Sequence, residues 1–592
     1  MLQKATAFGN DYDNKGANIK VRNLDKSKPV FGIDLGTTNS AISVITEGSE
    51  PKTIQLVDGR MTMPSCVMLK DGRFIVGREA YEHRGEANVV YSVKRLMQDP
   101  EATVNLKDGE KTEVFTPAEI SAEILRGLVE QTGGVYGDIE DVIVTVPAYF
   151  DQNGVNATKT ACEMAGLNLL GIANEPTAAS LCYDLKPEEG NTKDVLVYDL
   201  GGGTFDTTLM RIQQGGSDDL DAIYGEGSAI GGNNSTSSVV TLGIRGDMHL
   251  GGDDIDSALL KIIYKRLKDD GFDVTKIPPL YKENMLLRLE GYKKAASAGN
   301  IFEMSVKCTS QDGYTIDDTI SVQPGDFKKA AEIIFARTKK IVDELLRATP
   351  NKANTIVLTG GSTKSKWIQS CLQEAFPSYT IDCALDPDLS VSQGAAIQGN
   401  AVKFGNESVQ IFDILPLTIG VRDADGVVEP LIKGGTPLPV TRSVTFTTDH
   451  DDQEQVTLHI MQGSTKDADE CVSLGSLHID GIKKQKAGIP VLVVSMLVTA
   501  NRYMVCTAQI DGIEKKLELD LSGEIQKATS SNGDSKIVKR MKGIAKTLNG
   551  KEKAAFTKLI EDYELGNASV LDLKKFVRTH REEKIEDDSA RG

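Results

Sequence analysis

The sequence is poor in tryptophan and histidine, with one Trp and six His among 592 residues. Its eight cysteines are scattered, and none forms a Cys-x-x-Cys pair. Few Cys and His ligands argue against a zinc site, and scattered Cys fits a reducing compartment. No run of 18 apolar residues occurs, so no membrane span is expected. Lys and Arg number 67 against 85 Asp and Glu, and this net charge of -18 argues against broad binding to nucleic acid or anionic membranes.

A chain of this length is too long to fold around a single hydrophobic core, so several domains are expected. The patterning predicts a disordered N-terminal extension at 1–29, an α/β domain at 30–405, a linker at 406–413, an all-β sandwich at 414–522 and a short helical segment at 523–592. The extension is polar, lacks the apolar stretch of a signal peptide and carries acids that a transit peptide avoids.

Hydrophobic periodicity supports these assignments. Residues 142–146 and 355–358 are typical of buried strands, and 118–131 of a helix. From about residue 414, apolar residues alternate as half-buried strands do. After residue 533 a helical period returns, over 537–548, 551–564 and 570–583. The Gly-, Ser- and Asn-rich stretch 213–241 predicts a mobile surface excursion between two strands.

Two segments repeat one pattern. Residues 31–40 (FGIDLGTTNS) and 195–206 (VLVYDLGGGTFD) each hold an apolar strand that reaches an Asp, a Gly-rich turn with Thr, and a return strand. Such a turn offers backbone N–H groups and hydroxyls to phosphate, and Asp34 or Asp199 can hold Mg²⁺ directly or through water. One Gly-rich turn is weak evidence, but two matched turns predict a duplicated phosphate-binding hairpin.

A third element, residues 356–364 (IVLTGGSTK), runs from a strand through Gly360 and Gly361 into a helix at 367–376. Glycines there let a flat base approach the backbone. Alone, such a turn is as often a packing feature as a binding site.

These three elements, in this order, resemble the actin/sugar-kinase/heat-shock ATPase fold. The motifs VTVPAYF (144–150), NEPTAAS (174–180), YDLGGGTFD (198–206), GDMHLGG (246–252) and TGGSTK (359–364) resemble the DnaK-type, seventy-kilodalton heat-shock chaperones. The resemblance runs from about residue 30 to 521 and weakens in the last 70 residues. It implies an actin-like ATPase domain of two duplicated lobes, followed by the sandwich and a short helical lid.

The resemblance implies a set of site residues. The expected catalytic residues are Lys94, Glu175, Asp199, Thr204, Asp206 and Asp34. Four of them, Asp34, Glu175, Asp199 and Asp206, are also expected to hold the metal ion. The expected nucleotide contacts are Gly36, Thr37, Thr38, Asn39, Gly201, Gly202, Gly203, Thr204, Gly251, Gly252, Glu290, Lys293, Lys294, Ser297, Gly360, Gly361, Ser362, Lys364 and Asp388. Where relatives carry arginines that sandwich adenine, Lys294 and Lys364 stand here, and an ammonium does not stack on a base.

The resemblance also implies a relay between domains. Pro147, Lys159 and Asp413 match positions of that relay, whereas Val155 and Gly171 replace arginines that contribute to linker docking and cochaperone response. The linker VQIFD (409–413) is expected to add as a strand to the ATPase sheet.

The expected peptide-contacting residues of the sandwich are Val421, Ala424, Phe446, Asp449, Val456 and Leu458. Ala424 and Asp449 stand where relatives arch larger apolar groups over a peptide, which predicts a weaker, more polar arch. The alternative is a sandwich that binds no peptide and only regulates.

The expected function is an ATP-dependent cytoplasmic chaperone that binds and releases extended apolar segments of unfolded proteins. ATP or ADP, Mg²⁺ and, as a further ion, K⁺ are the expected cofactors. A J-domain cochaperone and a nucleotide-exchange factor are expected partners in altered form, with no nucleic acid or membrane. Two alternatives stay open: a regulatory or exchange-factor homologue with little cycling, and a small-molecule kinase on the same fold.

Overall fold

The structure is a computed structural model that describes residues 2–4, 28–46, 50–182, 192–214, 237–296, 300–383, 386–404, 409–423, 425–499, 504–510, 512–519 and 555–558. The chain divides into two compact units, residues 1–524 and 525–592. In the second unit residues 555–558 are helical, inside the helix predicted at 551–564. The helices predicted at 537–548 and 570–583 lie outside the described residues.

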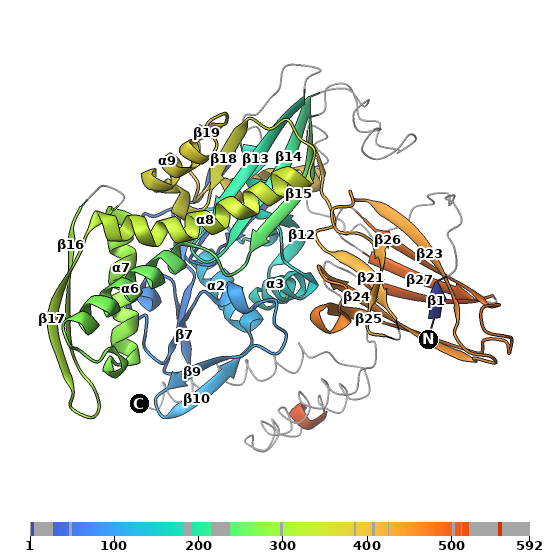
Figure 1. Cartoon of the computed structure of the whole chain (residues 1–592), viewed down its shortest axis with the longest axis horizontal. Coiled ribbons are helices and arrows are strands. Elements are labelled where there is room, and N and C mark those ends of the chain that lie inside the picture. The colour runs from blue at the N-terminus through green and yellow to red at the C-terminus, as the bar shows by residue number, and fades with distance from the viewer. Residues whose placement is uncertain are drawn as a thin grey trace. The chain divides into compact units, whose positions relative to one another are not determined.

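Two six-stranded sheets of the first unit share one plan (Figure 1). The first contains β12 (Asn168–Asn174), β11 (Asp141–Val146), β2 (Phe31–Leu35), β3 (Asn39–Val44) and β4 (Lys52–Thr53), with β5 (Met63–Pro64) beside β3. The second contains β19 (Thr380–Asp382), β18 (Thr355–Thr359), β13 (Thr192–Leu200), β14 (Phe205–Gln214), β15 (Ser237–Asp247) and β20 (Val409–Phe412). In each, an antiparallel hairpin is extended on one side by two parallel strands. The repeat seen in the sequence is therefore a repeat of sheet topology.

Helices and small sheets surround these two sheets. The helices are α1 (Arg78–Glu82), α2 (Pro117–Glu130), α3 (Gln152–Ala165), α4 (Glu175–Cys182), α6 (Gly252–Asp269), α7 (Pro279–Ala296), α8 (Pro324–Ala348), α9 (Lys366–Ala375) and α10 (Ser390–Phe404). Short 3-10 turns are η1 (Val93–Leu96), η2 (Val274–Lys276), η3 (Gly361–Lys364) and η4 (Ala468–Glu470). The small sheets are β6 (Cys66–Lys70), β7 (Arg73–Val76) and β8 (Val89–Tyr91); β9 (Val104–Asp108) and β10 (Lys111–Phe115); and β16 (Phe302–Thr309) and β17 (Thr315–Val322).

Local sequence explains the helix boundaries. The helix predicted at 118–131 is α2, which begins one residue earlier, at Pro117. Thr116 caps it: its hydroxyl accepts a hydrogen bond from the Glu119 N–H at 3.2 Å, and the Glu119 carboxylate accepts one from the Thr116 N–H at 2.7 Å. Pro117 occupies the first turn, where a missing N–H costs nothing.

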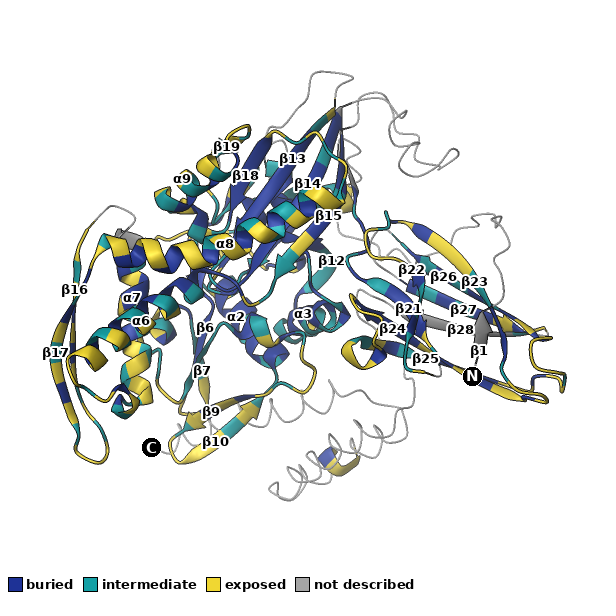
Figure 2. Cartoon of the chain, in the orientation of Figure 1, coloured by how far each residue is buried: buried dark blue, intermediate teal, exposed yellow. Residues whose placement is uncertain are grey.

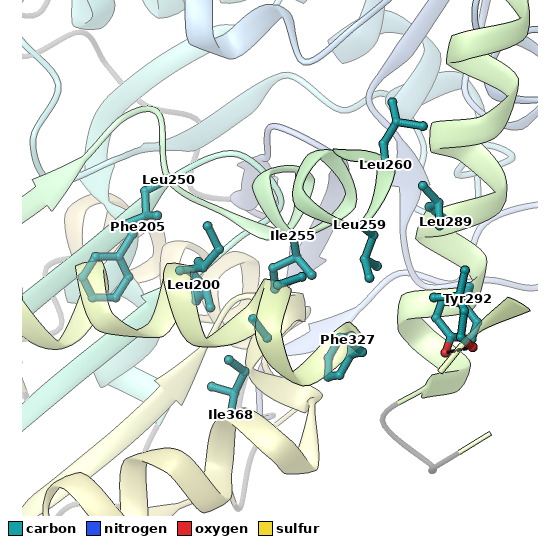
Figure 3. Packing of buried hydrophobic residues seen from close by; sticks show 14 of the residues in the cluster. Leu200, Phe205, Leu250, Ile255, Leu259, Leu260, Leu289, Tyr292, Phe327 and Ile368 are labelled. Carbon is teal, nitrogen blue, oxygen red and sulfur yellow. Dashed lines mark hydrogen bonds between the residues drawn. The ribbon is translucent and has the colours of Figure 1, made fainter. Parts of the chain in front are cut away.

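The cores lie between sheets and helices. In Figure 2 the strands β13, β14 and β18 are dark blue and α8 carries one buried and one exposed face. Phe327 at the start of α8 packs with Ile255 and Leu259 of α6 and with Ile368 of α9 in the largest cluster (Figure 3). This cluster fixes the helices behind the second hairpin.

A two-sheet sandwich follows β20, as the alternating pattern predicts. One sheet contains β1 (Leu2–Lys4), β23 (Val440–Thr448), β26 (Val491–Val498), β27 (Met504–Ile510) and β28 (Ile513–Leu519). The other contains β22 (Val428–Ile432), β21 (Thr418–Arg422), β24 (Gln455–Gly463) and β25 (Val472–Asp480). Apolar side chains of both sheets form one core.

Two expectations are corrected. Disorder at 1–29 is wrong for Leu2–Lys4, which forms β1 and pairs with β23, because the open edge of β23 supplies backbone partners that the segment lacks alone. Residues 5–27 lie outside the described residues. The excursion expected at 213–241 is narrower: Gln213 belongs to β14 and residues 237–241 to β15, because the β14–β15 ladder extends to both ends, while 215–236 lie outside the described residues.

Gly394 of α10 tests the close packing beside the first sheet. A Cβ there would collide with the backbone carbonyl of Ala178 in α4. We expect Gly394→Ala to lower the free energy of unfolding by about 1–3 kcal/mol, through overpacking. The control is Gly325→Ala in α8, where a Cβ meets nothing within 4 Å. Denaturant unfolding measures the free energy of unfolding of both variants and the wild type. A Gly394→Ala chain that is more stable than the wild type would contradict the close packing.

Candidate functional site

The two hairpins meet at one cavity of about 480 Å³. Asp34 near the end of β2 and Asp199 near the end of β13 both line it. The hairpin turns also touch each other, because a Cβ on Gly202 would collide with Thr38 Oγ1. Glycine is therefore required where the turn of one sheet approaches the turn of the other.

Most of the predicted residues line this cavity. They are Asp34, Gly36, Thr37, Thr38, Asn39, Lys94, Glu175, Asp199, Gly201, Gly202, Thr204, Glu290, Lys293, Gly360, Gly361, Ser362, Lys364 and Asp388. Ile255 and Phe327, members of the core cluster of Figure 3, line it as well. The cavity thus combines a polar set of groups with an apolar wall.

Four predicted residues are not among the residues that line the cavity but lie next to lining residues. Gly252 donates its N–H to the Gly201 carbonyl at 3.0 Å, and Gly251 packs against the backbone of Gly202. Gly203 accepts a hydrogen bond from Arg95 Nη2 at 2.6 Å. Asp206 pairs with Asp199 across the β13–β14 hairpin. These residues shape the second hairpin from behind.

A buried ion pair lies between the hairpins. Lys94 of η1 donates to Glu175 at the start of α4, and the two residues are 5% and 8% exposed. A buried ammonium needs a carboxylate partner, since the loss of solvation is otherwise uncompensated. The ion pair therefore keeps the Lys94 ammonium charged at the wall of the cavity.

Burial raises the pKa values of the aspartates around this pair. It raises the pKa of Asp34 to about 7, with the charge of Glu175 as the second cause, although Lys94 and a 3.1 Å hydrogen bond from Thr145 act against the rise. It raises the pKa of Asp206 to about 8 and that of Asp199 well above its usual range. One lysine does not compensate four clustered carboxylates, so an added positive charge would stabilise their charged forms.

The opposite wall carries groups suited to a nucleoside. Lys293 Nζ donates to the Gly252 carbonyl at 2.9 Å and pairs with Asp256 at 2.7 Å. Ser362 Oγ donates to the Gly201 carbonyl at 2.9 Å, which ties the third element to the second hairpin. Ser297 and the side chain of Lys294 lie outside the described residues.

Lys364 lines the cavity and forms two ion pairs. Its ammonium pairs with Asp386 at 2.6 Å and with Asp388 at 2.7 Å. The predicted lysine thus serves as a counter-ion for two carboxylates at the rim of the cavity.

Several residues at the site were missed by sequence reasoning. Asp253 lines the cavity directly after Gly252, and an acid after paired glycines was the available signal. Glu290 accepts hydrogen bonds from Arg84 at 2.9 Å and from Tyr81 at 2.6 Å. These partners lie about 200 residues from Glu290 in sequence, so no local pattern joins them.

The linker adds to the second sheet as predicted. β20 runs parallel to β15 in register from Ser237↔Val409 to Val240↔Phe412. Asn174 at the end of β12 donates a side-chain hydrogen bond to Asp413. The linker therefore contacts both six-stranded sheets.

The other relay positions lie around α3. Pro147 is buried and lies between β11 and α3 in the chain. In α3 the Lys159 Nζ lies 3.8 Å from the Glu163 Oε1. Val155 packs with Phe150 in a small apolar cluster. The Gln152 N–H at the start of α3 donates to Gln462 Oε1 of β24 at 3.0 Å, which joins α3 to the sandwich.

The residues expected to contact peptide are mostly in the sandwich core. Val421, Phe446, Val456 and Leu458 are at most 4% exposed and belong to one apolar cluster. Asp449 follows β23 and pairs with His450 at 2.6 Å. Ala424 lies outside the described residues.

No group of three or more His, Cys, Asp or Glu side chains in the described part of the chain is arranged to hold a metal by itself. None of the helices among the described residues is long and apolar enough to cross a membrane.

Comparison with known proteins gives consistent similarities. Residues 30–591 match a family model described as Hsp70 protein. The chaperone protein DnaK of Mycoplasmopsis pulmonis is 34% identical over 523 residues, which cover 87% of this chain and 81% of the relative. The chaperone protein DnaK of Mycoplasmoides gallisepticum is 31% identical over 578 residues, covering 90% and 92%. That of Mycoplasmopsis synoviae is 33% identical over 520 residues, covering 86% and 79%.

The raised pKa of Asp206 predicts a pH effect on stability. The folded chain keeps this carboxyl protonated up to about pH 8, whereas the unfolded chain loses the proton near its usual pKa of 3.8. The contribution of the Asp206 carboxyl to the free energy of unfolding is therefore largest at acid pH and is lost as the pH rises through about 8. The Tm of Asp206→Asn minus that of the wild type should therefore be larger at pH 8.5 than at pH 5.5, by about 2–4 °C. The exposed control Asp138→Asn should show no such difference between the two pH values. An identical pH dependence of Tm in all three chains would contradict the raised pKa.

Proposed function

This chain belongs to the Hsp70 family and is an ATP-dependent chaperone with ATPase activity, and we propose that the paired hairpins, Lys94 and Glu175 form its hydrolytic centre. The convergence of both hairpins and the buried ion pair on one cavity carries the proposal. The family implies an actin-like ATPase domain followed by a β-sandwich. The match over 30–591 includes the sandwich, which a small-molecule kinase reading leaves unexplained.

The phosphates of ATP would bind between the two turns. The turn at residues 36–38 and the turn at 201–204 present backbone N–H groups and the hydroxyls of Thr37, Thr38 and Thr204. Thr38 Oγ1 is buried without a hydrogen-bond partner among the described residues, so it is available to a phosphate oxygen. The base would lie toward Glu290 and Lys293, beside Gly361.

The residues fit Mg²⁺ that arrives with the nucleotide. Asp206 Oδ1 is buried and has no hydrogen-bond partner among the described residues, and carboxylate oxygens are the ligands that Mg²⁺ prefers. Mg²⁺ usually takes one or two carboxylates with phosphates and waters, so it does not require a complete set of protein ligands, and none is found among the described residues. Asp34, Asp199, Asp206 and Glu175 would hold the ion directly or through water. When bound, the ion supplies neutralisation of phosphate charge.

Lys94 would act on the transferring phosphoryl group. The γ-phosphate competes with Glu175 for its ammonium, which stabilises charge that develops as water attacks the γ-phosphorus in line. Glu175, released from full pairing, can orient the attacking water. Catalysis then rests on positioning and charge, without a covalent intermediate.

Lys94 gives the test of this centre. We expect Lys94→Ala to slow single-turnover ATP hydrolysis by about 10²–10³-fold while ADP still binds, because the cavity remains and the transition-state charge loses its partner. The control is Lys70→Ala, an exposed lysine at the end of β6. Hydrolysis in Lys94→Ala at the wild-type rate would remove Lys94 from the centre.

We further propose that the linker couples this centre to an extended polypeptide bound by the sandwich. β20 pairs with β15, β15 pairs with β14, and β14 carries Asp206, so backbone hydrogen bonds run from linker to hairpin. A second route runs from β11 through Pro147 and α3 to Gln462 on β24. β24 also carries Val456 and Leu458, two of the expected peptide-contacting residues. The docking of the linker strand β20 is therefore an equilibrium that both the nucleotide in the cavity and a polypeptide on the sandwich could shift.

Asp413 tests this coupling. We expect Asp413→Ala to keep basal hydrolysis and to lose most of its stimulation by an extended apolar peptide, because the linker loses the hydrogen bond from Asn174. Glu470→Ala, an exposed acid of the sandwich, is the matched control. Peptide titrations of the single-turnover rate measure the effect. Full stimulation in Asp413→Ala would show that this contact does not transmit the signal.

A further inference from the structure

The short strand β1 covers one edge of the sandwich. Leu2–Lys4 pairs antiparallel with the end of β23, in the register Leu2↔Thr448, Gln3↔Thr447 and Lys4↔Phe446. β1 is the outermost strand of its sheet, in the order β1-β23-β26-β27-β28 (Figure 1). Without β1, the edge of β23 would offer unpaired N–H and C=O groups to any extended chain.

This edge coincides with residues expected to contact peptide. The paired stretch of β23 includes Phe446 and ends directly before Asp449. The apolar side chains expected to line a channel are packed in the core, so backbone pairing at this edge remains as a way to hold a polypeptide. The N-terminal strand therefore occupies backbone groups that a bound polypeptide would use.

The side chains at this end of β23 also favour an incoming strand. The hydroxyls of Thr447 and Thr448 are buried, at 7% and 1% exposure, and have no partner among the described residues. Buried hydroxyls are normally paired, so these two can accept a polar group from a different occupant.

We propose that Leu2–Lys4 is an intrachain competitor that must leave β23 before an extended polypeptide pairs there. The inference rests on the proposed peptide binding by the sandwich. Because residues 5–27 tether β1 to the same chain, its effective concentration at this edge exceeds that of a free tripeptide, which would bind weakly. The competitor sets a threshold: short or poorly matched peptides fail to displace it, and well-matched ones succeed.

A deletion tests the competition. Removing residues 2–4 should lower the Kd for a fluorescein-labelled heptapeptide with central leucines about two- to tenfold, because the competing strand is lost. The matched control removes residues 12–14, which keeps β1 and shortens the tether equally. Fluorescence anisotropy on the full-length chains gives the three values. Equal affinity in all three overturns the inference and leaves peptide binding standing.

Hydrogen exchange separates the remaining outcomes. The amides of residues 446–448 should exchange faster in the 2–4 deletion than in the control, and a synthetic peptide of residues 1–10 should restore their protection. If the leucine peptide binds to no chain, the proposed peptide binding fails and the competition with it; restored protection then shows only that the edge accepts an added strand in place of β1. Unchanged exchange, or no protection by the added peptide, overturns the inference.

Discussion

The contact between the two glycine-rich turns is the constraint on which the rest of the site depends. Gly202 lies so close to Thr38 that no side chain fits between them, and Ser362 and Gly252 each bond the Gly201 carbonyl. The Gly202–Thr38 contact brings together two sheets whose strands are far apart in sequence, and the bonds to the Gly201 carbonyl hold the second turn in place. The cavity lies at this junction, and Lys94 and Glu175 line it together with both turns.

A second consequence of the junction is electrostatic. Four carboxylates converge near one lysine in a buried place, which destabilises the charged form of the empty site. The same arrangement favours a ligand that brings cations. In the proposed centre, stability and binding are therefore opposed: the carboxylates that cost free energy of folding without nucleotide are those that would attract its metal complex.

Sequence alone predicted the parts that are locally encoded. Asp34 and Asp199 end apolar strands before Gly-rich turns, and the alternating residues of β23 and β24 specify a sandwich. It missed Arg84 and Tyr81 on Glu290, because such pairing depends on tertiary contact between distant segments. It gave Leu2–Lys4 as disordered, since three polar and apolar residues carry no strand signal until an open edge supplies their partners. It did not show that Val421 and Leu458 are core residues, because alternation identifies the buried face but not what covers it.

The linker strand has a consequence beyond signalling. β20 is the last strand of its sheet, and β15 lies directly inside it, as β23 lies inside β1. If the linker leaves, as the proposed coupling requires, β15 would present an open row of backbone donors and acceptors to its surroundings. The undocked chain would then carry the same hazard of edge-to-edge association that a chaperone counters in unfolded proteins, and pairing between its own copies would compete with the return of the linker.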